Sequence, residues 1–385
     1  MSPVPQPHLR LHSISIFVTD LQASVEFYVD RLGFTIAFDQ SFSNGERVVG
    51  VAPPEGPTIL VLSAPSAGSP DHQRIGKATP VGFVSEKIED TFDSWSLRGV
   101  RFRKAPDPIE TFGRYASFDD PDGNHFLLFE FDQATRAMEA ERRAAQEFEY
   151  AKQVQARLFP QSLPSLERLD YAGECLQARH VGGDYYDFLS LGPDRLRLLV
   201  ADVSGKGMPA ALLMANLQAN VRSLSGAAGD VPDRLAHSVN RLFYESSVAS
   251  AYATLFLADY EESTGRLRYV NCGHLPPLIL RSDASVESLS ATSTVVGLFP
   301  TLRTAHSAEA QLHAGDLLVM YTDGVTEAIN KAGEEFGEER LIDVLRRCQG
   351  DAPASVIGSV IREVKAFSVA EQEDDITLLV AKRIR

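Results

Sequence analysis

Short hydrophobic runs that carry an aspartate at one end recur in the second half of the chain. Residues 196–203 read Leu-Arg-Leu-Leu-Val-Ala-Asp-Val, residues 316–323 read Asp-Leu-Leu-Val-Met-Tyr-Thr-Asp, and Asp-Asp-Ile-Thr-Leu-Leu-Val follows at 374–380. Apolar runs of this length predict buried strands. The acids at the strand ends are then expected along one rim of a common core. These aspartates, with one more after a Gly-Gly pair, are Asp184, Asp202, Asp323 and Asp374.

The first third of the chain has a different pattern, which occurs twice. Alternating residues at 11–18 predict a strand, and Asp20 predicts the cap of a helix that ends at Gly33. Strands are expected next at about 35–40, 46–52 and 58–63. A second strand and helix follow at 81–84 and 88–98, with a last strand at 125–129. Two βαβββ units account for this order.

The connector between these parts contains no glycine or proline from Gln133 to Phe159 and is rich in Ala, Glu, Arg and Gln. These residues favour helix, so the segment predicts one long helix. Heptad-like spacing places Phe148 and Leu158 as the large apolar residues of a weak seam. The seam favours a marginally stable dimerising helix that acts as a regulatory linker. A solvated tether is the alternative.

Composition and charge narrow the functional classes. The chain has 385 residues and a formal net charge of −15, which argues against nucleic-acid binding and against docking to anionic membranes. Three separated cysteines without a Cys-x-x-Cys pair suit a reducing cytoplasm and no structural zinc. The N-terminal residues lack the apolar core of a signal peptide, and no apolar run is long enough to span a bilayer. A cytoplasmic protein of two domains with a connecting element is expected.

Crowded carboxylates repel one another, and a hard divalent cation between them removes the repulsion. Oxygen ligands of this kind suit Mg²⁺ or Mn²⁺. Taken singly, each aspartate is also an ordinary turn or helix-cap residue. The combination of all four is what favours a metal site.

The motifs Gly182-Gly-Asp184, Asp202-Val-Ser-Gly-Lys-Gly207, Thr322-Asp-Gly324 and Asp374-Asp-Ile-Thr377 occur in that order. This series resembles the PPM family of metal-dependent serine/threonine phosphatases, in particular its SpoIIE/RsbU branch, over roughly residues 160–385. The resemblance implies an α-β-β-α sandwich and two Mn²⁺ or Mg²⁺ ions. It also implies hydrolysis of phosphoserine or phosphothreonine by a metal-activated water.

The resemblance implies a role for each matching residue. Asp202 would bridge both ions, Asp184 and the backbone carbonyl of Val203 would hold one, and Asp323 and Asp374 would hold the other. The positions expected beside the metals or the phosphate are Gly183, Gly205, Lys206 and Asp375.

Several residues near these motifs have a structural explanation or no assigned catalytic role. Lys206 is equally well explained as an exposed loop lysine. Ser204 stands where many eukaryotic relatives have a histidine, so no general acid is assigned. His274 is expected to be structural, and Asp187 to order the Tyr-Tyr-Asp turn.

The N-terminal part carries Val25-Glu-Phe-Tyr28, Leu32-Gly-Phe34 and Asp120-Pro-Asp-Gly-Asn124. These motifs resemble the vicinal oxygen chelate (VOC) superfamily, which includes glyoxalase I and bleomycin-resistance proteins. Enzymes of that family bind a metal through His and Glu, but the matching positions here are Ser13, Pro80 and Leu127, and His12 is one residue out of phase. A metal-free module that binds an unknown small molecule or a protein is expected. A VOC metalloenzyme is the alternative.

The combined prediction is an α+β protein with three segments. These are a paired βαβββ VOC module at 8–132 acting as sensor, a helical linker at 133–160 and a PPM phosphatase domain at 161–385. By family resemblance the substrate is a phosphorylated STAS-domain anti-sigma-factor antagonist, and the chain forms a homodimer. A scaffold that binds phosphoproteins without turnover is the alternative function.

Overall fold

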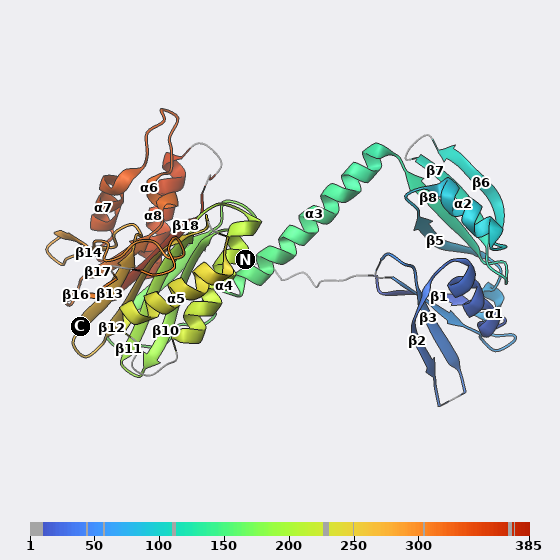
Figure 1. Cartoon of the computed structure of the whole chain (residues 1–385), viewed down its shortest axis with the longest axis horizontal. Helices are drawn as coiled ribbons and strands as arrows, with labels where there is room; N and C mark the ends of the chain where they lie inside the picture. The colour runs from blue at the N-terminus through green and yellow to red at the C-terminus, as the bar shows by residue number, and fades with distance from the viewer. Residues whose placement is uncertain are drawn as a thin grey trace. The chain divides into compact units, whose positions relative to one another are not determined.

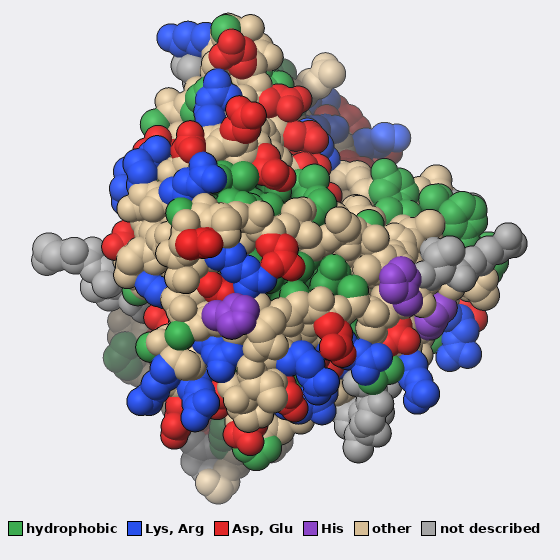
Figure 2. Space-filling model, turned by 90° about the vertical axis from the view of Figure 1, so that its left-hand side faces the viewer, with side chains coloured by type: hydrophobic (Ala, Val, Ile, Leu, Met, Phe, Trp, Pro, Cys, Tyr) green, Lys and Arg blue, Asp and Glu red, His purple; other side chains and the backbone are tan. Residues whose placement is uncertain are grey.

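The computed structural model describes residues 11–385 except 44, 57, 110–112, 226–230, 249, 303–304, 369–371 and 373. The N-terminal residues, including 8–10 of the predicted first domain, lie outside this set. The chain divides into two compact units, Met1–Arg143 and Ala144–Arg385. None of the described helices is long and apolar enough to cross a membrane. Acidic and basic side chains are intermixed over the face shown in Figure 2, which presents no continuous basic surface among the described residues.

The N-terminal unit consists of two βαβββ modules, as the sequence predicts (Figure 1). The first sheet has the order β1-β4-β3-β2 and the second β5-β8-β7-β6, and in each the first strand is parallel to its neighbour. The elements are β1 (Ser13–Phe17), α1 (Leu21–Glu26) with a π-helical turn (Phe27–Arg31), β2 (Thr35–Ser41), β3 (Arg47–Ala52), β4 (Ile59–Ser63), a 3-10 turn (His72–Arg74), β5 (Ala78–Val84), α2 (Ile88–Leu97), β6 (Arg101–Ile109), β7 (Gly113–Asp119) and β8 (His125–Phe131).

The sharp turn before β8 joins the two modules. The hydroxyl of buried Tyr28 donates to Oδ2 of Asp120 at 3.2 Å, and Nδ2 of Asn124 donates to the carbonyl of Phe17 at 3.0 Å. The Asp-Pro-Asp-Gly-Asn motif therefore connects the second module to the first through hydrogen bonds. Of the positions at which related enzymes bind metal, Ser13 and Pro80 are exposed and Leu127 is half-buried.

Helix α3 (Gln133–Ala156) follows β8 directly. It ends three residues before the predicted end, so Leu158 lies outside the helix. Leu158 packs instead against the core beneath α4 and α5, and Nε2 of Gln218 donates to its carbonyl at 3.1 Å. The predicted seam therefore differs from the structure at Leu158, because this side chain lies beyond the helix end and packs, partly buried, against the core of its own unit.

The C-terminal unit contains two antiparallel five-stranded sheets, with orders β10-β11-β12-β13-β16 and β15-β14-β17-β18-β9. Its strands are β9 (Leu169–Leu176), β10 (Asp184–Gly192), β11 (Arg195–Val203), β12 (Ala253–Glu261), β13 (Arg266–Cys272), β14 (Leu278–Leu280), β15 (Val286–Ser288), β16 (Ala308–Gln311), β17 (Leu317–Tyr321) and β18 (Ile376–Arg383). Its helices are α4 (Met208–Leu224), α5 (Pro232–Ser246), α6 (Asp323–Thr326), α7 (Gly337–Arg347) and α8 (Pro353–Phe367).

Three hydrophobic layers hold these elements in an α-β-β-α sandwich (Figure 1). One layer lies between the sheets and includes Phe256 and Met320. The second lies between the first sheet and α4 and α5, and the third between the second sheet and α7 and α8. The strands are apolar on both faces because both faces are covered, which is why they appear as continuous apolar runs in the sequence. The predicted sandwich is confirmed.

Candidate active site

The four predicted aspartates meet at one edge of the sandwich. Asp184 opens β10 and is the cross-strand partner of Asp202 near the end of β11. Asp323 follows β17 as the first residue of α6, and Asp374 precedes β18. Because the strand ends of both sheets lie at this edge, residues far apart in the sequence become electrostatic neighbours.

The pKa values of these carboxylates reflect their crowding. Burial raises the pKa of Asp202 to about 7, and the charges of Asp323, Asp374 and Asp375 add to the effect. Burial likewise raises the pKa of Asp184 well above its usual range, with Asp202 as the next cause. A shared cation would remove this repulsion, because opposite charge favours the ionised form.

Two threonines that the sequence analysis did not single out hold Asp184 in place. The hydroxyls of Thr322 and Thr377 donate to the same Oδ2 of Asp184, at 2.7 and 2.5 Å. The Thr322 hydroxyl also accepts the backbone N–H of Thr377 at 3.0 Å, which ties β17 to β18. Both residues belong to motifs recognised in the sequence, but only the fold shows that they orient a residue of the other sheet.

Asp375 connects the start of β18 to the loop that carries Gly182-Gly-Asp184. Its Oδ1 accepts the backbone N–H of Ala178 at 2.8 Å. A Cβ at Gly182 would collide with the Asp375 carboxylate, and a Cβ at Gly324 would collide with its backbone carbonyl. Only glycine permits these close approaches.

The end of α3 contacts the same loop. Buried Gln155 donates from Nε2 to the carbonyl of Gly182 at 2.7 Å and accepts the backbone N–H of Gly182 at 3.0 Å. About two helical turns earlier, the ring of Phe148 stacks on His180, with centroids 5.3 Å apart. The linker helix therefore touches the segment that positions Asp184.

The N-terminus of α4 lies beside the aspartates. Gly205 and Gly207 have φ values of 98° and 72°, which turn the chain from β11 into this helix. Nζ of Lys206, in the same loop, lies 2.7 Å from Oδ2 of Asp374. The backbone N–H of Val203 donates to the carbonyl of Gly183 at 3.3 Å, so the Val203 carbonyl lies at the same edge. Free N–H groups at a helix start and a nearby lysine favour an anion.

The donor set at this edge fits a hard divalent cation in its chemistry, because it consists of carboxylates and a backbone carbonyl. Within the described ranges, no three His, Cys, Asp or Glu side chains are already arranged around a common ion position. Asp374 is paired with Lys206 and Asp184 with two threonines, so the donors are near one another without forming a closed ligand shell.

Two other polar residues near the strands are structural. His274 is buried, with Nδ1 2.8 Å from the Thr254 hydroxyl and Nε2 3.1 Å from the Tyr321 carbonyl, and burial lowers its pKa to about 4. A neutral ring therefore bridges the two sheets. Asp187 lies within β10 rather than in a turn, where it accepts two hydrogen bonds from Arg222 at 2.7 and 2.9 Å. The expectation that it orders a turn was wrong because the strand begins at Asp184.

Comparison with known proteins identifies both units. Residues 192–384 match the family model of stage II sporulation protein E (SpoIIE), and residues 10–128 match that of the glyoxalase/bleomycin resistance protein/dioxygenase superfamily. The chain belongs to the SpoIIE family, its C-terminal unit is a PPM-type phosphatase domain, and its N-terminal unit is a VOC domain.

Three similar proteins are informative. Protein IcfG of Synechocystis sp. is 30% identical over 264 residues, which are 62% of this chain and 41% of IcfG. Phosphoserine phosphatase RsbU of Bacillus subtilis is 28% identical over 260 residues, 67% of this chain and 75% of RsbU. A crystal structure of the RsbU and RsbW domains of a Mycobacterium tuberculosis protein matches with a TM-score of 0.51 at 28% identity, covering 58% of this chain and 62% of that chain. The chain thus spans less than half of the length of IcfG.

Proposed function

We propose that this protein removes phosphate from phosphoserine or phosphothreonine on a partner protein. The observation that carries the proposal is the meeting of Asp184, Asp202, Asp323 and Asp374 at one edge, beside the N-terminus of α4. Acidic donors suit divalent cations, and the helix N-terminus suits a phosphate group. The likeness to RsbU, which is named a phosphoserine phosphatase, supports the choice of phosphoserine.

The proposed cofactors are two Mn²⁺ or Mg²⁺ ions in the phosphatase domain and none in the VOC domain. Such ions supply Lewis acidity towards water and the phosphoryl oxygens. In the proposed arrangement Asp202 would hold both ions, Asp184 and the Val203 carbonyl would hold one, and Asp323 and Asp374 would hold the other. Lys206 and the start of α4 add positive charge where a phosphoryl group would lie.

The proposed substrate is a phosphorylated STAS-domain protein, and the VOC domain is proposed to be a sensor for a small molecule or a protein. Resemblance to the SpoIIE/RsbU branch supports the substrate. The contact between Gln155 of α3 and Gly182 supports regulation through the linker, because a shift of α3 would move the loop that carries Asp184.

An Asp202→Asn variant tests the activity. Phosphate release from a phosphorylated STAS-domain protein in Mn²⁺ should fall by at least about 100-fold, as expected when a main electrostatic contributor is lost. Asp194→Asn, at an exposed position in the β10–β11 turn, is the matched control and should keep wild-type turnover. Elemental analysis of the full chain should give two Mn²⁺ per wild-type chain and fewer in Asp202→Asn.

Each alternative has its own outcome in this experiment. Near wild-type turnover by folded Asp202→Asn protein contradicts the metal assignment. Binding of the phosphoprotein without release of phosphate by the wild type identifies a scaffold instead. More than two tightly bound ions in the wild type contradict the metal-free VOC domain.

A further inference from the structure

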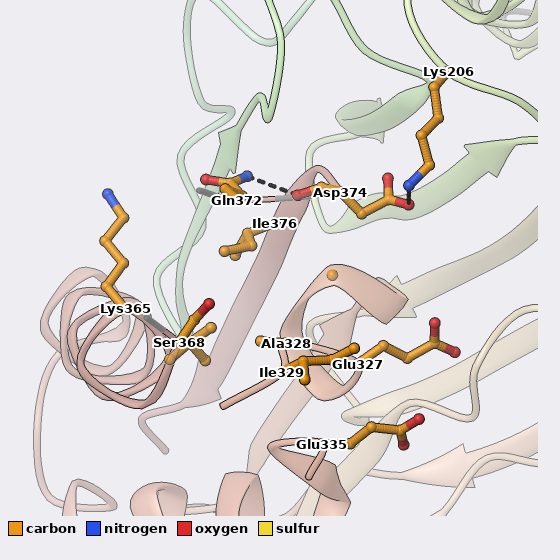
Figure 3. Close-up of a pocket in the computed structure, with 12 residues that line it drawn as sticks. Lys206, Glu327, Ala328, Ile329, Glu335, Lys365, Ser368, Gln372, Asp374 and Ile376 are labelled. Carbon is orange, nitrogen blue, oxygen red and sulfur yellow. Dashed lines mark hydrogen bonds and ion pairs between the residues drawn. The ribbon is translucent and has the colours of Figure 1, made fainter. Parts of the chain in front are cut away.

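A cavity of about 300 Å³ opens next to the candidate active site. Asp374 and Lys206 form the part of its wall nearest the aspartate cluster, and Gly324 shares that wall. The rest comes from the chain after α6, the C-terminal half of α8 and the start of β18 (Figure 3). Because Asp374 belongs to both, the cavity is continuous with the place proposed for the phosphoryl group.

One part of the cavity lining is apolar. Val364 of α8 and Ile376 of β18 are almost completely buried, at 1% and 3% exposure. Ile329, in the segment after α6, is 44% exposed and lies at the rim. Ile329 therefore offers an accessible apolar side chain on which an aliphatic stem can pack, and Val364 and Ile376 complete the apolar wall with little exposed area of their own.

Another part of the lining is acidic. Figure 3 shows Glu327 and Glu335 extending side by side, while Lys365 on α8 extends away from them. Among the described residues, neither glutamate carboxylate takes part in an ion pair or a side-chain hydrogen bond, and Lys206 is paired with Asp374. The wall formed by the two glutamates therefore presents negative charge that a cation from outside can neutralise.

The lining and its position together indicate one kind of occupant. A lysine or arginine has an aliphatic stem for the apolar part and a charged head for the glutamates. A chain that presents a phosphoserine to the aspartates brings its neighbouring residues past the cavity, since an extended chain advances about 3.3–3.6 Å per residue. A phosphorylated substrate is thus able to fill both sites at once.

We propose that this cavity is a specificity subsite, which receives a lysine or arginine side chain within a few residues of the phosphoserine of the substrate. The inference rests on the phosphatase function proposed above and adds a requirement on the substrate sequence. A glutamate at the same substrate position would meet Glu327 and Glu335 and would be disfavoured, since like charges repel.

The test uses the full chain with Mn²⁺ and a set of phosphoserine peptides. In each peptide one residue is Lys, Arg, Leu or Glu, and the set places this residue at every position from three before to three after the phosphoserine. At one position or more, kcat/KM for Lys or Arg should exceed that for Glu by about five- to tenfold, because an ion pair that contributes up to about fivefold is replaced by a repulsion of like charges. Glu335→Lys should reverse this preference for a basic residue over Glu, and Glu335→Gln should weaken the preference. Glu339→Gln, at an exposed position on α7, is the matched control and should leave the order as in the wild type.

Failure of the subsite and failure of the phosphatase function give different results. Equal kcat/KM for all peptides, or a charge preference that Glu335→Lys does not alter, overturns the subsite while phosphate release continues. Turnover of p-nitrophenyl phosphate without turnover of any peptide also overturns it, because the subsite requires peptides to bind. No phosphate release from any of these compounds contradicts the proposed function and the inference with it.

Discussion

At the scale of single residues, the same burial has opposite consequences for acids and for the histidine. Burial and neighbouring carboxylates raise the pKa of Asp202 to about 7, which makes its site receptive to a cation. Burial without a charged partner lowers the pKa of His274 to about 4, which keeps its ring neutral. A neutral ring donates from one nitrogen and accepts at the other, as a bridge between Thr254 and the Tyr321 carbonyl requires.

The depressed pKa of His274 predicts a pH-dependent loss of stability. As the pH falls from about 6.5 to about 4, the unfolded chain takes up a proton at this residue and the folded chain does not. The free energy of unfolding should therefore decrease across this window, by up to about 3 kcal/mol from this residue. His274→Gln should be less stable at pH 7.5, through loss of the bridge, but should depend less on pH between 6.5 and 4.

Urea unfolding in the presence of a chelator measures this effect, and the difference between variant and wild type cancels the contribution of other groups. His237→Gln, on the exposed side of α5, is the matched control and should follow the wild-type pH dependence. Parallel curves for His274→Gln and the wild type between pH 6.5 and 4 would show that the folded protein protonates His274 freely.

At the scale of elements, the active edge depends on contacts between strand ends and on the end of α3. Gln155 uses both ends of its side-chain amide on Gly182, and it also accepts from Nε2 of Gln177 at 2.5 Å. A backbone segment held in this way has its position set by the helix. The position of the loop before β10 therefore depends on the position of the end of α3.

Removing the Gln155 amide is expected to weaken metal binding without touching a proposed ligand. Gln155→Ala should raise the Mn²⁺ concentration for half-maximal turnover by about 10- to 100-fold, the usual effect of losing a group that orients a ligand. The matched control, Gln146→Ala, lies on the exposed surface of the same helix and should show wild-type Mn²⁺ dependence. Unchanged Mn²⁺ dependence in folded Gln155→Ala protein would show that the end of α3 does not influence metal binding.

At the scale of the whole molecule, dimerisation through α3 and its effect on activity are predictions that rest on the exposed side chains of this helix. Phe148 is still 38% exposed although it stacks on His180, and Tyr150 and Val154 of α3 are exposed at 62% and 64%. Tyr150 and Val154 share one side of the helix and Phe148 lies on another, so the exposed part of Phe148 is the apolar area for the predicted pairing with a second copy. Its modest size would make that pairing weak enough to be shifted. An effector that binds the two packing states differently would then change turnover.

Phe148→Glu is expected to weaken the dimer at least about fivefold and to change turnover on a phosphorylated STAS-domain protein, since a charge is placed in an apolar contact. His180→Ala is the comparison, because it removes the stacking within the chain and keeps Phe148 for pairing. Sedimentation and phosphate release are measured on all three proteins. A dimeric Phe148→Glu protein with wild-type turnover would identify α3 as a tether.

The sequence by itself determined the two repeated βαβββ modules and the acidic residues at the strand ends, and its motifs predicted the sandwich through their resemblance to a known family. Strand patterns and turn residues are local properties, and Asp184, Asp202, Asp323 and Asp374 stand at points where apolar runs begin or end. The length of α3 was also predictable to within three residues, because the segment lacks helix-breaking residues. The paired modules and the sandwich are confirmed, whereas the metal roles of the aspartates stay a prediction.

Only the tertiary structure decided which side chains support that edge. Thr322 and Thr377 reach Asp184 across 138 and 193 residues of chain, and Gln155 reaches Gly182 from a different element. Leu158 fitted a helical seam by spacing, yet it is partly buried against the core of its own unit, since a local pattern does not say which surface will cover an apolar residue. Local periodicity specifies the elements, and the partners of a polar or apolar side chain are fixed only when distant segments pack together.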